Sequence, residues 1–361
     1  MPVKMADSSQ PPIGPSRPWR LPISNRTLIH LAAGLLVAGL VLVVVSREAD
    51  DVPGAVDVLS DASLPWLAAA LAVQVLNYAF LGFQLGRLVG GEPRLGKRVA
   101  VRVALVVYGL GTLLPGAPAP GMVIAATELS RRGIDRGRAA LAFFLSAWFN
   151  VRSFLVLAML TAISATLRGR VPDDSRALVL GSAGFIAAAL ALTAAIVRRP
   201  ALGDRVGRIL EALDWHGTGR TARQDTTRLQ ATALGVVASR RDGFLIASAT
   251  LASRLTDAVC LRLALVAVGI HVSMGVVLVA YVVSIVASSV PLLPGGLGLV
   301  EAAVPELLHH YGVPLDAAVA GTIAWRVVTL LLPALAGLAS YASLRLQTPT
   351  VSPPPRASLG P

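Results

Sequence analysis

The stretch Pro291-Leu-Leu-Pro-Gly-Gly-Leu-Gly-Leu-Val-Glu301 decides the fold of this chain. It interrupts an apolar run between residues 276 and 308, where two prolines and three glycines break any continuous helix. Hydrocarbon offers no water to a broken backbone, so such a break must be buried in protein or face a wet cavity. Neither half of the run reaches the roughly 20 residues that a membrane span needs. The stretch therefore predicts a re-entrant hairpin over residues 276–309, with an ordinary loop between two short helices as the alternative.

The returning arm of this hairpin has features of an anion site. It begins near Gly298 and carries Glu301 in its first turn. A helix N-terminus with bare glycine amides attracts negatively charged groups. Glu301 itself is expected either to cap the first-turn amides or to pair with Arg326 in the last span, and both roles are structural.

Composition places the chain in a membrane. Of its 361 residues, 55% are hydrophobic and 14% are charged, and the mean hydropathy is +0.69. This balance is typical of an all-α polytopic membrane protein. A net charge of +12 would suggest nucleic acid binding in a soluble protein, but here the arginines lie between apolar runs, so membrane topology explains the charge better. The single cysteine, Cys260, excludes an internal disulfide.

The apolar runs predict six membrane-spanning helices and two hairpins. The spans are expected at residues 27–46, 64–89, 138–167, 177–197, 244–270 and 315–346, and the hairpins at 100–129 and 276–309. In this order most of the 32 lysines and arginines fall on the cytoplasmic side, as the positive-inside rule requires. Both termini are therefore expected in the cytoplasm.

The same pattern divides the chain into five parts. Residues 1–26 and 347–361 are tails that we expect to be disordered. Residues 27–197 form the first membrane half, and residues 244–346 form the second. Residues 198–243 are a basic cytoplasmic linker, predicted either as an amphipathic helix on the membrane surface or as a solvated linker helix.

The two halves resemble each other in sequence. Leu113-Leu-Pro-Gly116 in the first hairpin matches Leu292-Leu-Pro-Gly295 in the second. Both halves then read span, span, hairpin, span, with hairpins that open to opposite sides, which predicts an inverted repeat. Paired, proline-interrupted segments at matching positions point to a transporter's binding site near the membrane midplane. A chance match in a chain rich in leucine and proline is the alternative.

Charged residues inside apolar segments predict a polar interior. Each costs about 2.5–3.5 kcal/mol at the bilayer centre, so contact with lipid is implausible. Arginine presents a forked donor set that matches phosphate, and arginines on three spans around the hairpins would form a phosphate-binding vestibule. Snorkelling or ion pairing is an equal alternative for each one, and we expect Arg254 to pair with Asp257 three residues later. The charged residues are Arg102, Arg152, Arg254, Asp257, Arg262, Glu301, Glu306 and Arg326.

The motif Pro294-Gly-Gly-Leu-Gly-x-x-Glu301 resembles the signature of the lysylphosphatidylglycerol synthase transmembrane-region family, also called the flippase-like family. The likeness extends over residues 28–346. The first hairpin resembles the family at Pro115-Gly116 and then departs from it with Ala-Pro-Ala-Pro-Gly121. From the residues and the resemblance together, the expected substrate-binding residues are Arg152, Arg254, Arg326, Gly295, Gly296, Gly298, Glu301, Pro115 and Gly116.

The resemblance implies a membrane protein that translocates or binds an anionic phospholipid, or a polyprenyl-phosphate-linked lipid, in the cytoplasmic membrane. Known members fuse such a membrane region to a lysyl-transferase domain, and we expect only the membrane part here. The sequence shows no Ser-His-Asp, metal-ligand or Walker pattern, so we expect no enzyme activity, no cofactor and no metal. The alternative function is that of a non-catalytic accessory subunit of a membrane glycosyltransferase or lipid-modifying enzyme.

Overall fold

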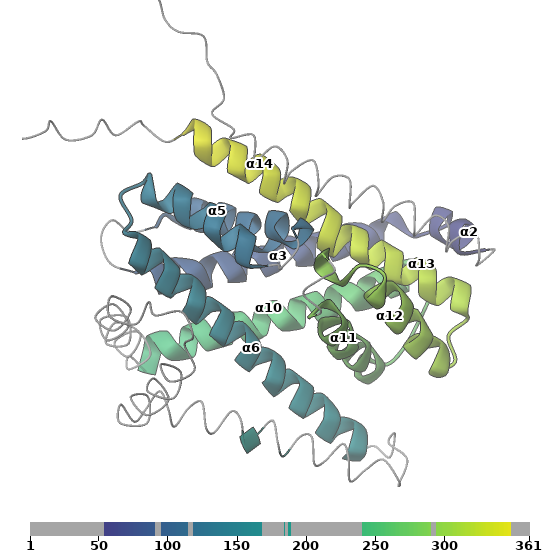
Figure 1. The fold of residues 1–361 in the computed structure, drawn as a ribbon. Coiled ribbons are helices and arrows are strands. Elements are labelled where there is room, and N and C mark those ends of the chain that lie inside the picture. The colour runs from purple at the N-terminus through teal and green to yellow at the C-terminus, as the bar shows by residue number, and fades with distance from the viewer. Residues whose placement is uncertain are drawn as a thin grey trace, which may run out of the picture.

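The computed structural model describes residues 54–90, 95–114, 118–167, 240–289 and 294–347, with isolated helical positions at 184, 187 and 188. Every regular element in these ranges is a helix (Figure 1). Four of the helices there are long and apolar enough to cross a membrane. The chain is therefore an all-α polytopic membrane protein, as its composition predicts.

Four long helices coincide with four of the predicted spans. Their ends lie within a few residues of the predicted positions, because long uninterrupted apolar sequence forms helix in hydrocarbon. The last span contains a π-helical turn just before Pro333, whose missing amide cannot continue the regular ladder. The spans are α3 (Leu64–Val89), α6 (Arg136–Leu167), α10 (Arg240–Ala267), and the succession of α13 (Leu315–Arg326), η4 (Val327–Leu331) and α14 (Leu332–Leu346).

Helices α3 and α10 pack along each other at the centre of the fold (Figure 1). Their contact includes buried polar groups: Ser253 Oγ donates to Asn77 Oδ1 at 2.5 Å, and the Asn77 amide donates to Gln74 Oε1 at 3.2 Å. Small residues let the two backbones approach, so that Cys260 Sγ lies 3.5 Å from the Ala70 carbonyl oxygen. Such small and polar contacts are the usual means of helix association in a membrane.

The predicted second hairpin consists of two short helices that pack against each other. α11 (Met274–Ser288) has 15 residues and α12 (Leu299–His310) has 12, so neither reaches a full span. Between them the 3-10 turn η3 (Pro294–Gly296) carries Gly295 and Gly296 at φ angles of 58° and 70°. Glycine adopts this left-handed conformation without steric cost. The short arms and the glycine turn agree with the sequence prediction, while re-entry into the membrane stays a prediction.

The predicted first hairpin has the same general form. Its first arm is α4 (Lys97–Ala104) continued by the π turn η1 (Leu105–Gly109) and the 3-10 turn η2 (Leu110–Leu113). Its second arm is α5 (Ala119–Ser130). A Cβ added at Gly121 would lie 2.5 Å from the Val107 carbonyl oxygen, so the two arms touch backbone to backbone.

The last span packs against both hairpins. α14 packs against η1 through glycines: a Cβ at Gly337 would lie 2.4 Å from the Leu105 carbonyl oxygen. Near its end, Arg345 Nε donates to Oε1 of the buried Glu128 in α5 at 2.7 Å. α13, by contrast, packs against α12. The last span therefore contacts both hairpins.

Several sequence predictions lie outside the described residues. These are the span at 27–46, the span at 177–197 apart from positions 184, 187 and 188, the tail 1–26, linker residues 198–239, residues 348–361, and Pro115 and Gly116. They stay predictions, as do the inverted repeat and the cytoplasmic position of the termini.

Cysteine labelling tests the predicted topology. In a Cys260→Ala background, a cysteine at the exposed Asp57 or His310 should react with a membrane-impermeant maleimide on intact cells. A cysteine at the exposed Arg131, which follows the first hairpin, should react only after the membrane is permeabilised. External labelling at Arg131 would show that the first hairpin crosses the membrane.

Candidate functional site

A cavity of about 460 Å³ lies where the four long helices and both hairpins meet. α3, α6, α10 and α11 contribute to its wall, together with residues of both hairpin turns and of the last span. The wall combines apolar side chains with a set of polar ones, as ligand sites commonly do. The polar residues of the lining include Gln74, Asn77, Tyr108, Asn150, Ser253, Arg254, Asp257, Tyr281, Ser284 and Arg326.

Helix α10 places a cation and an anion on the cavity wall. Arg254 Nη2 donates to Asn150 Oδ1 of α6 at 3.2 Å, and Asp257 Oδ2 accepts from the Tyr281 hydroxyl of α11 at 3.1 Å. The two side chains form no direct ion pair, but their opposite charges still attract each other, and the Tyr281 hydroxyl interacts with both. Among the described residues, Arg254 Nε and Asp257 Oδ1 are buried without a hydrogen-bond partner.

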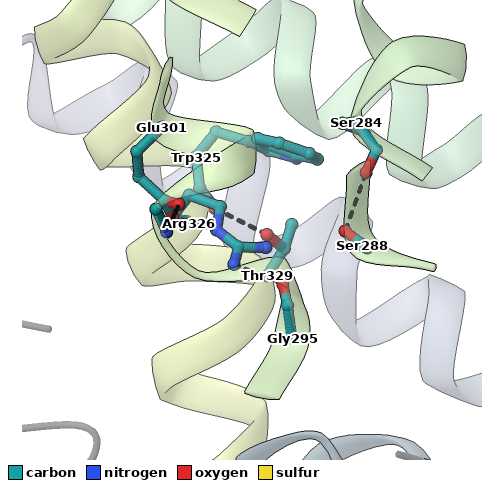
Figure 2. Close-up of polar contacts among 8 residues, drawn as sticks. Ser284, Ser288, Gly295, Glu301, Trp325, Arg326 and Thr329 are labelled. Carbon is teal, nitrogen blue, oxygen red and sulfur yellow. Dashed lines mark hydrogen bonds and ion pairs between the residues drawn. The ribbon is translucent and has the colours of Figure 1, made fainter. Parts of the chain in front are cut away.

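Arg326 links the last span to the second hairpin (Figure 2). Its Nε donates to Glu301 Oε1 at 2.7 Å, and its Nη2 donates to the Gly295 carbonyl oxygen at 2.6 Å. The second carboxylate oxygen of Glu301 accepts from the Gly298 amide at 2.8 Å. Glu301 therefore fills both roles that the sequence left open, capping its own helix and pairing with Arg326. The side chains of Arg326 and Glu301 are only 12% and 7% exposed.

The glycines of the second turn allow close approach. Gly295 lines the cavity, and a Cβ there would lie 2.9 Å from Leu330 Cδ1 and 3.6 Å from the Thr112 carbonyl oxygen of the first hairpin. At Gly296 a Cβ would lie 2.5 Å from Ser288 Cα at the end of α11. Gly298 has open space around it and serves as the N-cap of α12. The end of the first arm of the first hairpin thus meets the turn of the second hairpin at the cavity.

Trp325 adds a donor that the sequence did not single out. Its ring lies toward Ser284 across the site (Figure 2), and the residue is only 4% exposed. In the part of the chain that the structure describes, Trp325 Nε1 has no hydrogen-bond partner. Its position beside Arg326 in an apolar span was the available signal. Asn150 and Tyr281, polar residues inside apolar runs, could have been found in the same way.

The structure brings together only part of the predicted arginine cluster. Arg254 and Arg326 line the cavity, but Arg152 does not. Its guanidinium instead lies 5.3 Å from the centre of the Trp148 ring one helical turn earlier. Since Asn150 and Phe154 of α6 line the cavity, Arg152 between them falls on another face of the helix. Gly296, Gly298 and Glu301 do not line the cavity either, although Glu301 contacts the lining residue Arg326.

Comparison with known proteins places this architecture in a family. The family model described as lysylphosphatidylglycerol synthase TM region matches residues 31–337. This range includes both hairpins, three of the four long helices in full and the last span up to residue 337. A search of curated proteins gives no match. The matched residues also include the cavity-lining residues and the glycine turn with its Glu301–Arg326 pair. The chain belongs to the lysylphosphatidylglycerol synthase transmembrane-region family, and it is an integral, multi-pass membrane protein.

Proposed function

We propose that this protein translocates an anionic phospholipid, or a polyprenyl-phosphate-linked lipid, across the cytoplasmic membrane without acting as an enzyme. The polar headgroup would pass through the central cavity while the acyl or prenyl chains stay in the bilayer. The observation that carries this proposal is the cavity itself, because both hairpin turns and all four long helices border it and two arginines line it.

The donors of the cavity favour an anionic headgroup. Arg254 Nε and Trp325 Nε1 are buried N–H groups without a partner among the described residues. An unsatisfied buried donor costs about 1–3 kcal/mol, which a phosphate oxygen would recover. Charge-assisted hydrogen bonds from a guanidinium are also stronger than neutral ones. A phosphodiester is therefore the headgroup chemistry that fits this wall best.

The packing of the hairpins favours a cavity that opens to the two leaflets in turn. We propose that the two hairpins re-enter the membrane from opposite sides and that their turns meet at its midplane, as an inverted repeat would place them. Thr112 of the first hairpin lies next to Gly295 of the second, and both line the cavity. Rocking of one half against the other would then open the cavity to each leaflet in turn.

Arg254 is the residue for a direct test of headgroup binding. Replacing it with glutamine should weaken the binding of dioctanoyl phosphatidylglycerol by about ten- to a hundredfold, because one or two charge-assisted bonds are lost. Arg254→Lys should restore only part of the affinity, since the forked donor set is gone. Binding is measured by microscale thermophoresis on purified protein in detergent.

Arg152→Gln is the matched control for that experiment. This variant also removes an arginine from a membrane span, but Arg152 does not line the cavity. Its affinity for the lipid should therefore stay within about twofold of the wild-type value. Equal losses in the two variants would contradict headgroup binding in the cavity. Failure of the wild-type protein to bind any anionic lipid would favour the accessory-subunit function instead.

A further inference from the structure

The charged groups at the cavity balance to zero before any headgroup binds. Among the described residues, three charged side chains line it: Arg254, Asp257 and Arg326. Arg326 is neutralised by Glu301 at 2.7 Å, which leaves Arg254 against Asp257. A monoanionic phosphodiester would therefore give the site a net charge of −1. In surroundings of low dielectric constant an uncompensated charge is costly, so a compensating cation is needed.

Asp257 is the group at the site that can accept a proton. Several titratable and charged groups face Asp257 or line the same cavity: Arg254 and Cys260 on its own helix, Tyr281 of α11, Tyr78 of α3, Tyr108 of the first hairpin and Arg326 of α13. Arginine keeps its proton in proteins, and a tyrosine hydroxyl is already protonated near neutral pH. Both carboxylate oxygens of Glu301 already accept hydrogen bonds, from Arg326 Nε and from the Gly298 amide.

The hydrogen bonds of Asp257 leave a place for that proton. Its Oδ2 accepts from the Tyr281 hydroxyl at 3.1 Å, whereas its Oδ1 is buried and has no partner among the described residues. A proton on Oδ1 would therefore break no existing hydrogen bond. Ionisable residues inside a membrane domain are expensive, and proton relay is one of their recurring functions.

We propose that Asp257 takes up one proton for each monoanionic headgroup that enters the cavity, so that lipid translocation is coupled to proton movement. This inference rests on the proposed function. Water on one side of the membrane supplies the proton, and an O–H bond forms at Asp257 Oδ1. After the headgroup departs, this bond breaks and the proton returns to water. By thermodynamic linkage, protonation of Asp257 strengthens headgroup binding by the same factor by which the headgroup favours protonation.

The sign of the pH dependence follows from this linkage. A bound anion disfavours the Asp257 carboxylate, so the bound state holds more protons than the free state. Affinity for the anion is then highest at low pH and falls as pH rises, by up to about tenfold per pH unit where Asp257 changes its protonation on binding. Phosphatidylglycerol is the suitable probe, because its phosphodiester stays a monoanion throughout.

The experiment measures binding of dioctanoyl phosphatidylglycerol to the purified full-length protein between pH 5 and pH 9. We expect the affinity to fall with rising pH, and we expect proton uptake approaching one per bound lipid in weakly buffered solution with a pH indicator. Asp257→Asn should bind with little pH dependence and without the proton uptake. Asp242→Asn, which removes a half-exposed carboxylate of the same helix that pairs with Arg87, should behave as the wild type does.

The outcomes separate the two proposals. Binding that is independent of pH and releases or takes up no protons would overturn the coupling while leaving headgroup binding intact. Affinity that follows the Na⁺ concentration instead of pH would overturn it as well. An absence of binding at every pH would instead contradict the proposed function. If Asp257→Asn does not fold, the proton uptake of the wild-type protein decides alone.

Discussion

Replacing Gly296 with valine is expected to abolish lipid translocation. Gly296 is buried at φ 70°, where a residue with a side chain is strained by about 1–2 kcal/mol. A Cβ there would also lie 2.5 Å from Ser288 Cα and 3.0 Å from Ser288 N. These are backbone atoms of α11, so no rotamer change can relieve the overlap and the turn must move away. The measurement is flux of a labelled anionic lipid in liposomes, with protein yield recorded alongside.

Gly312→Val is the matched control for this substitution. Gly312 has a similar φ of 86°, but a Cβ there meets no atom within 4 Å. The control variant therefore has the backbone strain without a steric overlap, and it should keep most of the lipid flux of the wild type. Wild-type flux in Gly296→Val would mean that the turn has no part in the site. Equal losses in both variants would assign the effect to backbone strain alone.

The Arg326–Glu301 pair is expected to stabilise the fold strongly. Arg326→Gln leaves Glu301 a nearly buried carboxylate without its cation, which destabilises a protein by about 3–5 kcal/mol. The Gly298 amide still bonds Glu301, so the loss should fall toward the lower end of that range. Glu301→Gln should be costly too, because the neutral amide no longer balances the charge of the largely buried Arg326. Thermal unfolding in detergent measures both.

The double variant separates pairing from headgroup binding at Arg326. Glu301→Gln combined with Arg326→Gln removes both charges, so thermal stability should recover in large part. If Arg326 also binds the headgroup, as the sequence predicts, the double variant should still bind dioctanoyl phosphatidylglycerol about tenfold or more weakly than the wild type. Recovered stability with wild-type affinity would limit Arg326 to its structural role. No recovery of stability would contradict direct pairing of the two charges.

Much of the fold could be predicted because membrane sequence is strongly constrained. A long apolar run whose only proline lies in the first turn has few alternatives to a spanning helix, which is why α3 has the predicted bounds of 64 and 89. Proline and glycine act locally, so the break at Pro294–Gly296 also appears where the sequence places it. The capping of α12 by Glu301 is local for the same reason.

The arrangement of the site could be predicted only in part, because it depends on how the helices are rotated. Sequence spacing puts Arg254 and Asp257 on one face of α10, but it does not reveal that Asn150 and Tyr281 come within reach. The same uncertainty explains Arg152, which looks equivalent to Arg254 in sequence and lies outside the cavity lining. Tertiary packing, not local pattern, decides which intramembrane charges face one another.

Flux of a fluorescent phosphatidylglycerol across liposomes tests the proposed translocation most directly. The labelled lipid is placed in both leaflets with the purified protein, and an impermeant reductant then bleaches whatever reaches the outer leaflet. We predict that the wild-type protein and Arg152→Gln expose nearly all the label, whereas Arg254→Gln exposes the inner-leaflet label at least tenfold more slowly. Bleaching that stops at the outer leaflet in wild-type liposomes, as in protein-free ones, would contradict translocation by this protein.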